Sequence, residues 1–156
     1  MEKTNAMRIL DKNKIEYKTY SYDSANAISG IEVAQALNQN PDLVFKTLVT
    51  VAKSKQHYVF MIPVAKELDL KKAANSVNEK SVEMLKSKDL LPTTGYIHGG
   101  CSPIGMKKVF TTVIDASAGN CQNIIFSAGK IGYQIDTTLS ELQKVIKFTL
   151  SDIIIQ

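Results

Sequence analysis

The chain has 156 residues, of which 44% are hydrophobic and 22% charged, and its formal net charge is +4. This length and balance fit one folded domain over residues 1–156 and exclude a disordered chain. No apolar run approaches the roughly 20 residues that cross a bilayer, and the charged N-terminus lacks the apolar centre of a secretory signal. We therefore expect a cytoplasmic protein with no membrane partner.

The first half of the chain shows clear capping and turn signals between its apolar segments. The predicted elements are a helix over 5–13 capped by Thr4, an extended segment over 15–22, a short helix after the capping-box pair Ser29 and Glu32, a turn at 40–42, and strands over 44–52 and 57–64 joined by a hairpin at Lys55-Gln56.

The second half mixes shorter strands with helices. The predicted elements are an amphipathic helix over 69–77, a strand over 82–84, a helical turn over 86–91, a strand over 94–100 that ends in a glycine turn, strands over 109–115 and 123–126, a turn and strand over 129–135, and a last helix opened by the capping-box pair Thr138 and Glu141.

These elements follow one another irregularly rather than as repeated β-α-β units. The order favours a mixed α/β fold, in which a mostly antiparallel, curved and barrel-like sheet carries flanking helices. It disfavours a doubly wound nucleotide-binding sheet.

Lys46 is the most informative single residue. On the strand over 44–52 both faces are largely apolar, so the strand is expected to be buried. A lysine there must reach water along its aliphatic stem, find a partner, or point into a cavity, because an unpaired buried ammonium is very costly. The pattern leaves a structural and a functional role open.

Two glycine-containing turns and one tyrosine have a similar ambiguity. The segment 99–105 and the Ser127-Ala128-Gly129 turn expose backbone N–H groups that suit an oxygen ligand, but both also fit ordinary turns. Tyr20 either contributes its phenol to the same pocket or is a half-buried strand residue. Cys101 lies three residues from His98, and without an orienting third group a nucleophilic pair is disfavoured.

The remaining polar residues exclude or leave open other kinds of site. The two cysteines and two histidines lack the spacing of a disulfide framework or a zinc site. The lysines at 71, 72, 80, 86 and 88, and those at 107 and 108, are compatible with a polyanionic partner but equally with a solvated surface.

Short motifs in one consistent order, from about Thr4 to Ile153, resemble the YbaK/EbsC family of aminoacyl-tRNA deacylases. The residues that carry this resemblance are 44–48 (VFKTL), 68–74 (LDLKKAA), 80–84 (KSVEM), 94–96 (TGY), 99–105 (GGCSPIG) with Lys107 and Lys108, 112–115 (TVID) and 127–129 (SAG).

The resemblance implies a curved, barrel-like α/β fold and hydrolysis of a wrongly attached amino acid from transfer RNA, with no metal or organic cofactor. It implies catalytic roles for Lys46 and Tyr20. Family members commonly have an aliphatic residue where Cys101 stands and glutamine where Met106 stands. The resemblance further implies substrate contacts by Thr47, Gly100, Ser102, Pro103, Ser127 and Gly129, and makes Lys71, Lys72, Lys107 and Lys108 candidates for contacts with the acceptor end of transfer RNA.

The members most similar to this pattern remove cysteine from proline transfer RNA, where the substrate's own thiol attacks its ester, and act beside prolyl-tRNA synthetase. On this mechanism the protein only orients the ester and stabilises negative charge, with backbone amides around Gly100 and Ser102 as the expected donors. Two alternatives remain: removal of alanine by a bound water, and a non-catalytic module that binds transfer RNA ends.

Overall fold

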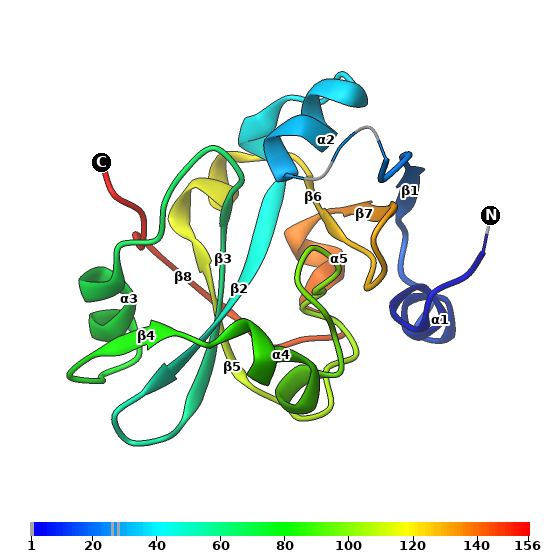
Figure 1. Ribbon diagram of the computed structural model, residues 1–156. Coiled ribbons are helices and arrows are strands. Elements are labelled where there is room, and N and C mark those ends of the chain that lie inside the picture. The colour runs from blue at the N-terminus through cyan, green and yellow to red at the C-terminus, as the bar shows by residue number, and fades with distance from the viewer. Residues whose placement is uncertain (1, 26, 28) are drawn as a thin grey trace.

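The computed structural model describes residues 2–25, 27 and 29–156, and it contains two β-sheets with helices around them (Figure 1). A three-stranded sheet has the order β1-β7-β6 and a five-stranded sheet the order β4-β2-β3-β5-β8. The elements are α1 (Asn5–Lys12), β1 (Lys18–Ser21), α2 (Gly30–Ala36), η1 (Pro41–Leu43), β2 (Phe45–Ala52), β3 (His57–Pro63), α3 (Leu70–Ser76), β4 (Val82–Met84), α4 (Ser87–Thr94), β5 (Thr111–Asp115), η2 (Ala116–Asn120), β6 (Ile124–Ser127), β7 (Tyr133–Thr137), α5 (Leu139–Leu142) and β8 (Thr149–Ser151).

The strand pairings confirm a mixed, mostly antiparallel α/β fold. Only β3–β5 and β5–β8 run parallel among the paired strands, and the other four pairings are antiparallel. The expected barrel-like closure is not seen among the described strands, because both sheets have open edges. A parallel bridge between Val44 and Ile125 connects the start of β2 to β6 and so joins the two sheets.

Local capping signals in the sequence correctly locate most of the helices. The Thr4 hydroxyl accepts a hydrogen bond from the Met7 amide, and Ser29 and Glu32 form the reciprocal capping box. Asp69 caps α3 through the amides of Lys71 and Lys72. Each cap satisfies backbone donors that the first helical turn leaves unpaired, which fixes where the helix begins. In the described part of the chain, no helix has the length and apolarity needed to cross a membrane.

The predicted strand over 94–100 is wrong. Helix α4 continues through Thr94, and Gly95 ends it in a left-handed conformation with φ of 87°. The Thr94 hydroxyl donates to the Leu90 carbonyl one helical turn earlier. The segment up to Thr94 is therefore helical, despite the β propensity of its sequence, and Gly95 provides the left-handed C-terminal residue. Residues 96–100 then form an irregular loop.

The C-terminal elements also differ from expectation. Helix α5 is a single short turn, and only half of its capping box forms, because the Glu141 carboxylate accepts from the Glu16 amide instead of turning back to Thr138. Strand β8 was not predicted at all. It pairs in parallel with β5. The paired residues are far apart in sequence, so no local sequence pattern predicts their pairing.

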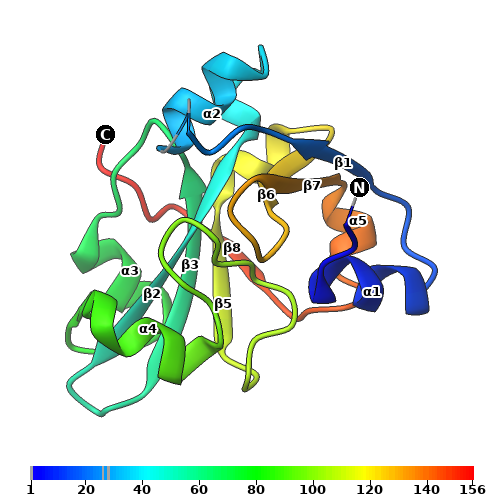
Figure 2. The same cartoon turned by 45° about the vertical axis from the view of Figure 1, so that its right-hand side comes forward.

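Helix α2 lies across the point where the two sheets meet (Figures 1 and 2). Its buried residues Val33 and Ala34 face inward, and Ala34 packs with Val44, Val64 and Ile125 around the bridge. Gly30 opens the helix directly against Val64, where an added Cβ would lie 2.5 Å from the valine Cγ1. The absence of a side chain at Gly30 therefore allows α2 to lie this close to the sheet.

Replacing Gly30 with alanine is expected to destabilise the protein by about 1–3 kcal/mol, because the new methyl group overpacks against Val64. The matched control is Gly119→Ala, where the added Cβ would meet only Leu150 Cδ1 at 3.4 Å, an ordinary contact. Urea denaturation of both variants measures the difference. Equal stabilities for the two variants would show that the approach of α2 is not sterically limited.

Candidate active site

A pocket of about 430 Å³ opens where β2 and β6 separate beyond their bridge. Because the bridge is parallel, both strands leave it in the same direction. One side of the pocket is formed by β2 residues from Phe45 to Leu48, and the other by Phe126 and Ser127 of β6 with the start of β7. Helix α2, Leu90 of α4 and the loop at 98–101 complete its walls.

The side of the pocket formed by β2 is an unpaired strand edge. Strand β4 pairs with β2 only from Thr50 to Ala52, so the first half of β2 has no neighbour on that side. On the β3 side, the Ala52 amide donates to the Gln56 carbonyl and the Val44 carbonyl accepts from the Val64 amide. The Val49 carbonyl instead accepts from the Leu85 amide on the other side. Since this direction alternates along an antiparallel strand, the N–H and C=O of Thr47 point away from β3, toward the free edge.

The pocket takes side chains from both faces of β2 because it wraps around this edge. Lys46 shares a face with Leu48, and Thr47 points to the opposite face with Phe45 and Val49. The Thr47 hydroxyl oxygen is buried and has no hydrogen-bond partner among the described residues. The Thr47 hydroxyl therefore lacks a hydrogen-bond partner within the described residues, and the Thr47 backbone groups face the free edge of β2.

The Lys46 side chain is half-buried, and its ammonium forms no ion pair with a described carboxylate. Burial lowers the pKa of this amine from its usual value, an effect that the charge of Glu67 partly offsets. Among the described residues that line the pocket, Lys46 is the one lysine or arginine, and none is an aspartate or glutamate. Within its described lining the pocket therefore presents one positive charge and no carboxylate.

The glycine-rich loop reaches the pocket through Gly99 and Cys101 rather than through Gly100. Gly100 is buried against the β6–β7 turn, where an added Cβ would lie 3.1 Å from the Ile131 nitrogen. Its amide already donates to the Ile97 carbonyl at 3.0 Å. The Gly100 amide therefore already holds the loop together, and oxyanion binding by the amides around Gly100 and Ser102 stays a prediction.

Ser102 and Pro103 support the loop from within and do not line the pocket. Ser102 is fully buried, and its hydroxyl accepts from the Ile104 amide at 3.3 Å. The Tyr96 hydroxyl donates to the Ile104 carbonyl on the same segment. These contacts fix the course of the loop, so a role for Ser102 and Pro103 in catalysis would be indirect.

The turn after β6 contributes Ser127 to the pocket. Its hydroxyl accepts a hydrogen bond from the Gly129 amide at 3.1 Å. Gly129 has φ of 94° and lies against the ring of Tyr96, where a Cβ would approach a ring carbon to 2.9 Å. Gly129 is therefore needed for the turn that orients Ser127, and it does not itself line the pocket.

Tyr20 lies beside the pocket rather than on its wall. It packs with Val44 and Ile125 at the bridge, and its hydroxyl donates to the Asp136 carboxylate at 3.0 Å. This hydrogen bond, together with burial, raises the pKa of the Tyr20 phenol. Asp136 also accepts from the Asn123 side chain at 2.6 Å. Sequence reasoning missed Asp136, although a carboxylate alternating with apolar residues on a strand is an available signal.

Other pocket residues were also missed, because they come from segments without a motif. They include Tyr22, Ile31, Leu90, Tyr133 and Gln134. Gln134 accepts a hydrogen bond from the Gln39 side chain at 2.8 Å, which connects the pocket wall to the chain after α2. Polar groups at the ends of β6 and β7 thus gather at the pocket through tertiary structure alone.

Cys101 has the environment of a core residue rather than a nucleophile. It packs with Val49 and Val59, and burial raises the pKa of its thiol to about 12. His98 is exposed at the pocket mouth and makes no described hydrogen bond to the thiol. The structure therefore agrees with the sequence in disfavouring a cysteine–histidine pair.

The four lysines expected to contact transfer RNA differ in their surroundings. Lys72 is paired with Asp152 and donates to the Ile154 carbonyl, so it anchors the C-terminal segment. Lys107 lies along Gly95 and donates to the Pro92 carbonyl at 3.4 Å. Lys71 and Lys108 are exposed. None of the four lines the pocket.

A larger hollow of about 1210 Å³ lies elsewhere, between α1 and strands β1 and β7 of the small sheet. It is wide and open, and its lining includes five carboxylates, those of Glu2, Asp11, Glu16, Asp136 and Glu141, and two lysines, Lys3 and Lys18. Three of these carboxylates are already ion-paired with lysines, so the hollow offers no concentration of positive charge to a nucleic acid. No group of three or more His, Cys, Asp or Glu side chains within residues 2–25, 27 and 29–156 is arranged to hold a metal ion.

We expect the Cys101 thiol to resist modification in the folded protein. With a pKa of about 12, only about one thiol in 10⁴ is ionised at pH 8. In a Cys121→Ser variant, which isolates Cys101, Ellman's reagent should react slowly in native buffer and quickly in denaturant. Rapid reaction of the native variant would contradict this burial.

Comparison with known proteins gives consistent matches. The model of the aminoacyl-tRNA editing domain family matches residues 26–145. EbsC of Enterococcus faecalis, a protein named provisionally as a Cys-tRNA(Pro)/Cys-tRNA(Cys) deacylase, is 49% identical over 136 residues, which cover 86% of this chain and 83% of EbsC.

Solved structures agree on the fold. One, described as a candidate trans-editing enzyme for prolyl-tRNA synthetase, has a TM-score of 0.85 at 19% identity and covers 99% of this chain and 100% of its own. A second, a scaffold designed to present a grafted epitope, has a TM-score of 0.84 at 20% identity and covers 98% and 99%. On the family match over most of its length, the chain belongs to the aminoacyl-tRNA editing domain family.

Proposed function

We propose that this protein removes cysteine from mischarged proline transfer RNA by cleaving the ester between them. The observation that carries the proposal is the half-buried ammonium of Lys46 in a pocket whose described lining contains no carboxylate. Such a site favours an anionic ligand and a transition state that gains negative charge. The name of EbsC, at 49% identity, supports cysteine as the amino acid.

The pocket suits a small aminoacyl group. Its volume of about 430 Å³ lies toward the lower end of small-molecule sites, and its deeper wall is apolar, with Phe45, Phe126 and Cys101. The exposed His98 and Gly99 lie nearer the mouth. On this arrangement the amino acid enters first, and the terminal ribose and its phosphate remain near the mouth with Lys46.

Because the pKa of Cys101, the one cysteine of the described lining, is raised to about 12, we assign the role of nucleophile to the substrate. The cysteine thiol attacks its own ester carbonyl, so that a sulfur–carbon bond forms and the ester carbon–oxygen bond breaks. The thiol proton passes to the departing ribose oxygen, which leaves as a hydroxyl. The products are transfer RNA and a cyclic thiolactone, which water then opens to cysteine.

The protein's contribution is to hold this geometry and to stabilise the oxyanion. The donors that fit are the Thr47 N–H at the free edge of β2 and the Thr47 hydroxyl, in place of Gly100. Lys46 holds the ribose–phosphate end. Tyr20, through Asp136, and Ser127 fix the adjoining walls. Specificity for one transfer RNA would come from prolyl-tRNA synthetase, and Lys71 and Lys108 stay proposed RNA contacts.

Removal of alanine by a bound water is the rival activity. That reaction needs a general base, and His98 is the one histidine of the described lining. The thiol route has no such requirement. Comparing Cys-tRNA(Pro) with Ala-tRNA(Pro), using wild type and a His98→Ala variant, therefore separates the two mechanisms.

Replacing Lys46 with alanine should reduce deacylation of Cys-tRNA(Pro) by about 10²-fold or more, because the site loses its charged contact with the substrate. The assay measures release of radiolabelled cysteine under single-turnover conditions. The control is Lys66→Ala, since Lys66 is exposed and does not line the pocket. Full activity of the Lys46 variant would exclude this mechanism.

Trapping of the product provides a second, independent measurement. An amine scavenger should open the thiolactone to a cysteinyl amide with a free thiol, which mass spectrometry detects, and His98→Ala should keep most of the cysteine activity. If cysteine alone is released, and if its release depends on His98, water rather than the thiol is the nucleophile.

A further inference from the structure

The positive charge of the protein is concentrated in one part of the chain. Residues 53–108 contain ten lysines and five carboxylates, a net charge of +5. The rest of the chain has nine basic and ten acidic residues, a net charge of −1. The segment 53–108 contains the β2–β3 hairpin tip, β3, α3, β4 and α4. The net charge of the whole protein therefore comes from this part of the chain.

Within this segment, the chain returns from the hairpin tip to the pocket. Strand β2 runs from the pocket to the tip, and β4 then pairs with the last residues of β2, with Val82 opposite Ala52. The Leu85 amide next donates to the Val49 carbonyl, closer to the pocket. Helix α4 follows, and its Leu90 lines the pocket. Figures 1 and 2 both show α4 beside the lower part of β2 and β4.

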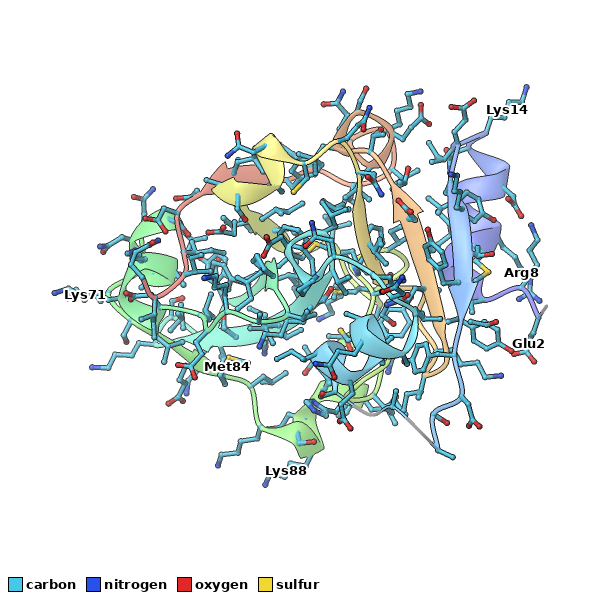
Figure 3. The ribbon with its side chains drawn as sticks, turned by 90° about the horizontal axis from the view of Figure 1, so that it is seen from above. Glu2, Arg8, Lys14, Lys71, Met84 and Lys88 are labelled. Carbon is cyan, nitrogen blue, oxygen red and sulfur yellow. The ribbon has the colours of Figure 1, made fainter. Side chains whose placement is uncertain are left out.

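Five exposed lysines mark this course, and we call them the lysine track. None of them has an ion pair within the described residues, and the track comprises Lys53, Lys55, Lys80, Lys86 and Lys88. Figure 3 shows Lys88 pointing into solvent on the side away from Lys14. Three carboxylates lie on the same part of the chain as the track. Glu83 is exposed, Asp89 is half-buried, and Glu79 accepts hydrogen bonds from the hydroxyls of Ser54 and Tyr58.

The length of the track suits a nucleic-acid strand. From Lys46 to Lys53 the strand rises about 23 Å, at about 3.3 Å for each residue. A stacked strand of about seven nucleotides covers the same length, at about 3.4 Å for each phosphate. A strand whose 3′ end lies in the pocket must leave through the mouth, and α4, whose Leu90 lines the pocket, carries the exposed Lys88 one turn or less away in sequence.

We propose that the lysine track binds the phosphate backbone of the transfer RNA acceptor stem as it leaves the pocket. This inference rests on the proposed function, because the track is aligned on a pocket that holds the 3′ end. The track excludes Lys72, which is engaged with the C-terminal segment, and four of its five lysines, all but Lys80, lie outside the motifs that carry the resemblance. The contacts are electrostatic, so they should be independent of base sequence.

The test compares two triple variants with the same change in charge. Lys80, Lys86 and Lys88 become glutamine in the track variant, and Lys12, Lys14 and Lys147, which are exposed and outside the track, become glutamine in the control. Fluorescence anisotropy measures binding of uncharged proline transfer RNA between about 50 and 200 mM salt. The track variant should lose about 2–3 from the slope of log K against log salt, and about tenfold or more in affinity at the lower salt.

Equal loss in the two variants would overturn the proposal, because it would show attraction by net charge alone. An unchanged RNA affinity together with weakened binding to prolyl-tRNA synthetase would also overturn it, and would assign the surface to a protein partner. Equal thermal unfolding midpoints for both variants and wild type establish that the fold is retained.

A second readout separates this inference from the proposed function. Deacylation is measured on full-length Cys-tRNA(Pro) and on a cysteinylated trinucleotide that ends before the track. The track variant should raise KM for the full-length substrate and leave the trinucleotide reaction unchanged. Loss of activity on both substrates would contradict the track. If wild type hydrolyses neither substrate but RNA binding still depends on the track, the proposed reaction fails while the RNA surface stands.

Discussion

The parallel bridge between Val44 and Ile125 is the constraint on which the pocket depends. This bridge is the point where the five-stranded sheet and the three-stranded sheet are hydrogen-bonded to each other. Beyond it, β2 and β6 each pair only within their own sheet. Twisted sheets joined at one point must separate along their length. The space between β2 and β6 is therefore a consequence of topology, and α2 covers the end where the sheets meet.

The same separation explains how a lysine is tolerated on an apolar strand. A lysine ammonium enclosed on an apolar strand without a partner would cost several kcal/mol. Because Lys46 projects from a face of β2 that lines the pocket, its amine loses only part of its hydration. The depressed pKa reports the remaining cost, which an anionic ligand would offset.

Features encoded locally were predictable from the sequence, and features that depend on long-range pairing were not. The caps at Thr4 and Ser29 set helix starts through neighbouring backbone groups, so their residue types suffice. Lys46 was conspicuous because strand periodicity placed a cation among apolar residues. The parallel pairing of β8 with β5, and the division into two sheets, depend on contacts between distant segments.

The glycine-rich loop shows a different limit. Its residue types predicted backbone donors for a ligand, and the structure instead uses the Gly100 amide to bond Ile97. Composition indicates that a backbone path is unusual, but not which of its amides stay unpaired. The free donor at Thr47 became visible only from the register of β2 with β3 and the early end of β4. Strand register therefore contributes chemical information that motif matching lacks.

The charges of the protein act on a ligand at two distances, at short range inside the pocket and at longer range outside it. Inside the pocket, one cation among uncharged residues acts on the few atoms that touch it. Outside, the net charge of +5 over residues 53–108 acts over the roughly 10 Å at which salt screens charges, while the rest of the chain is slightly negative and carries an acidic hollow. On the proposed function, a polyanion is attracted to the positive segment rather than to the rest of the chain. Because helix α4 belongs to this segment and its Leu90 lines the pocket, the proposed attraction would act close to the site.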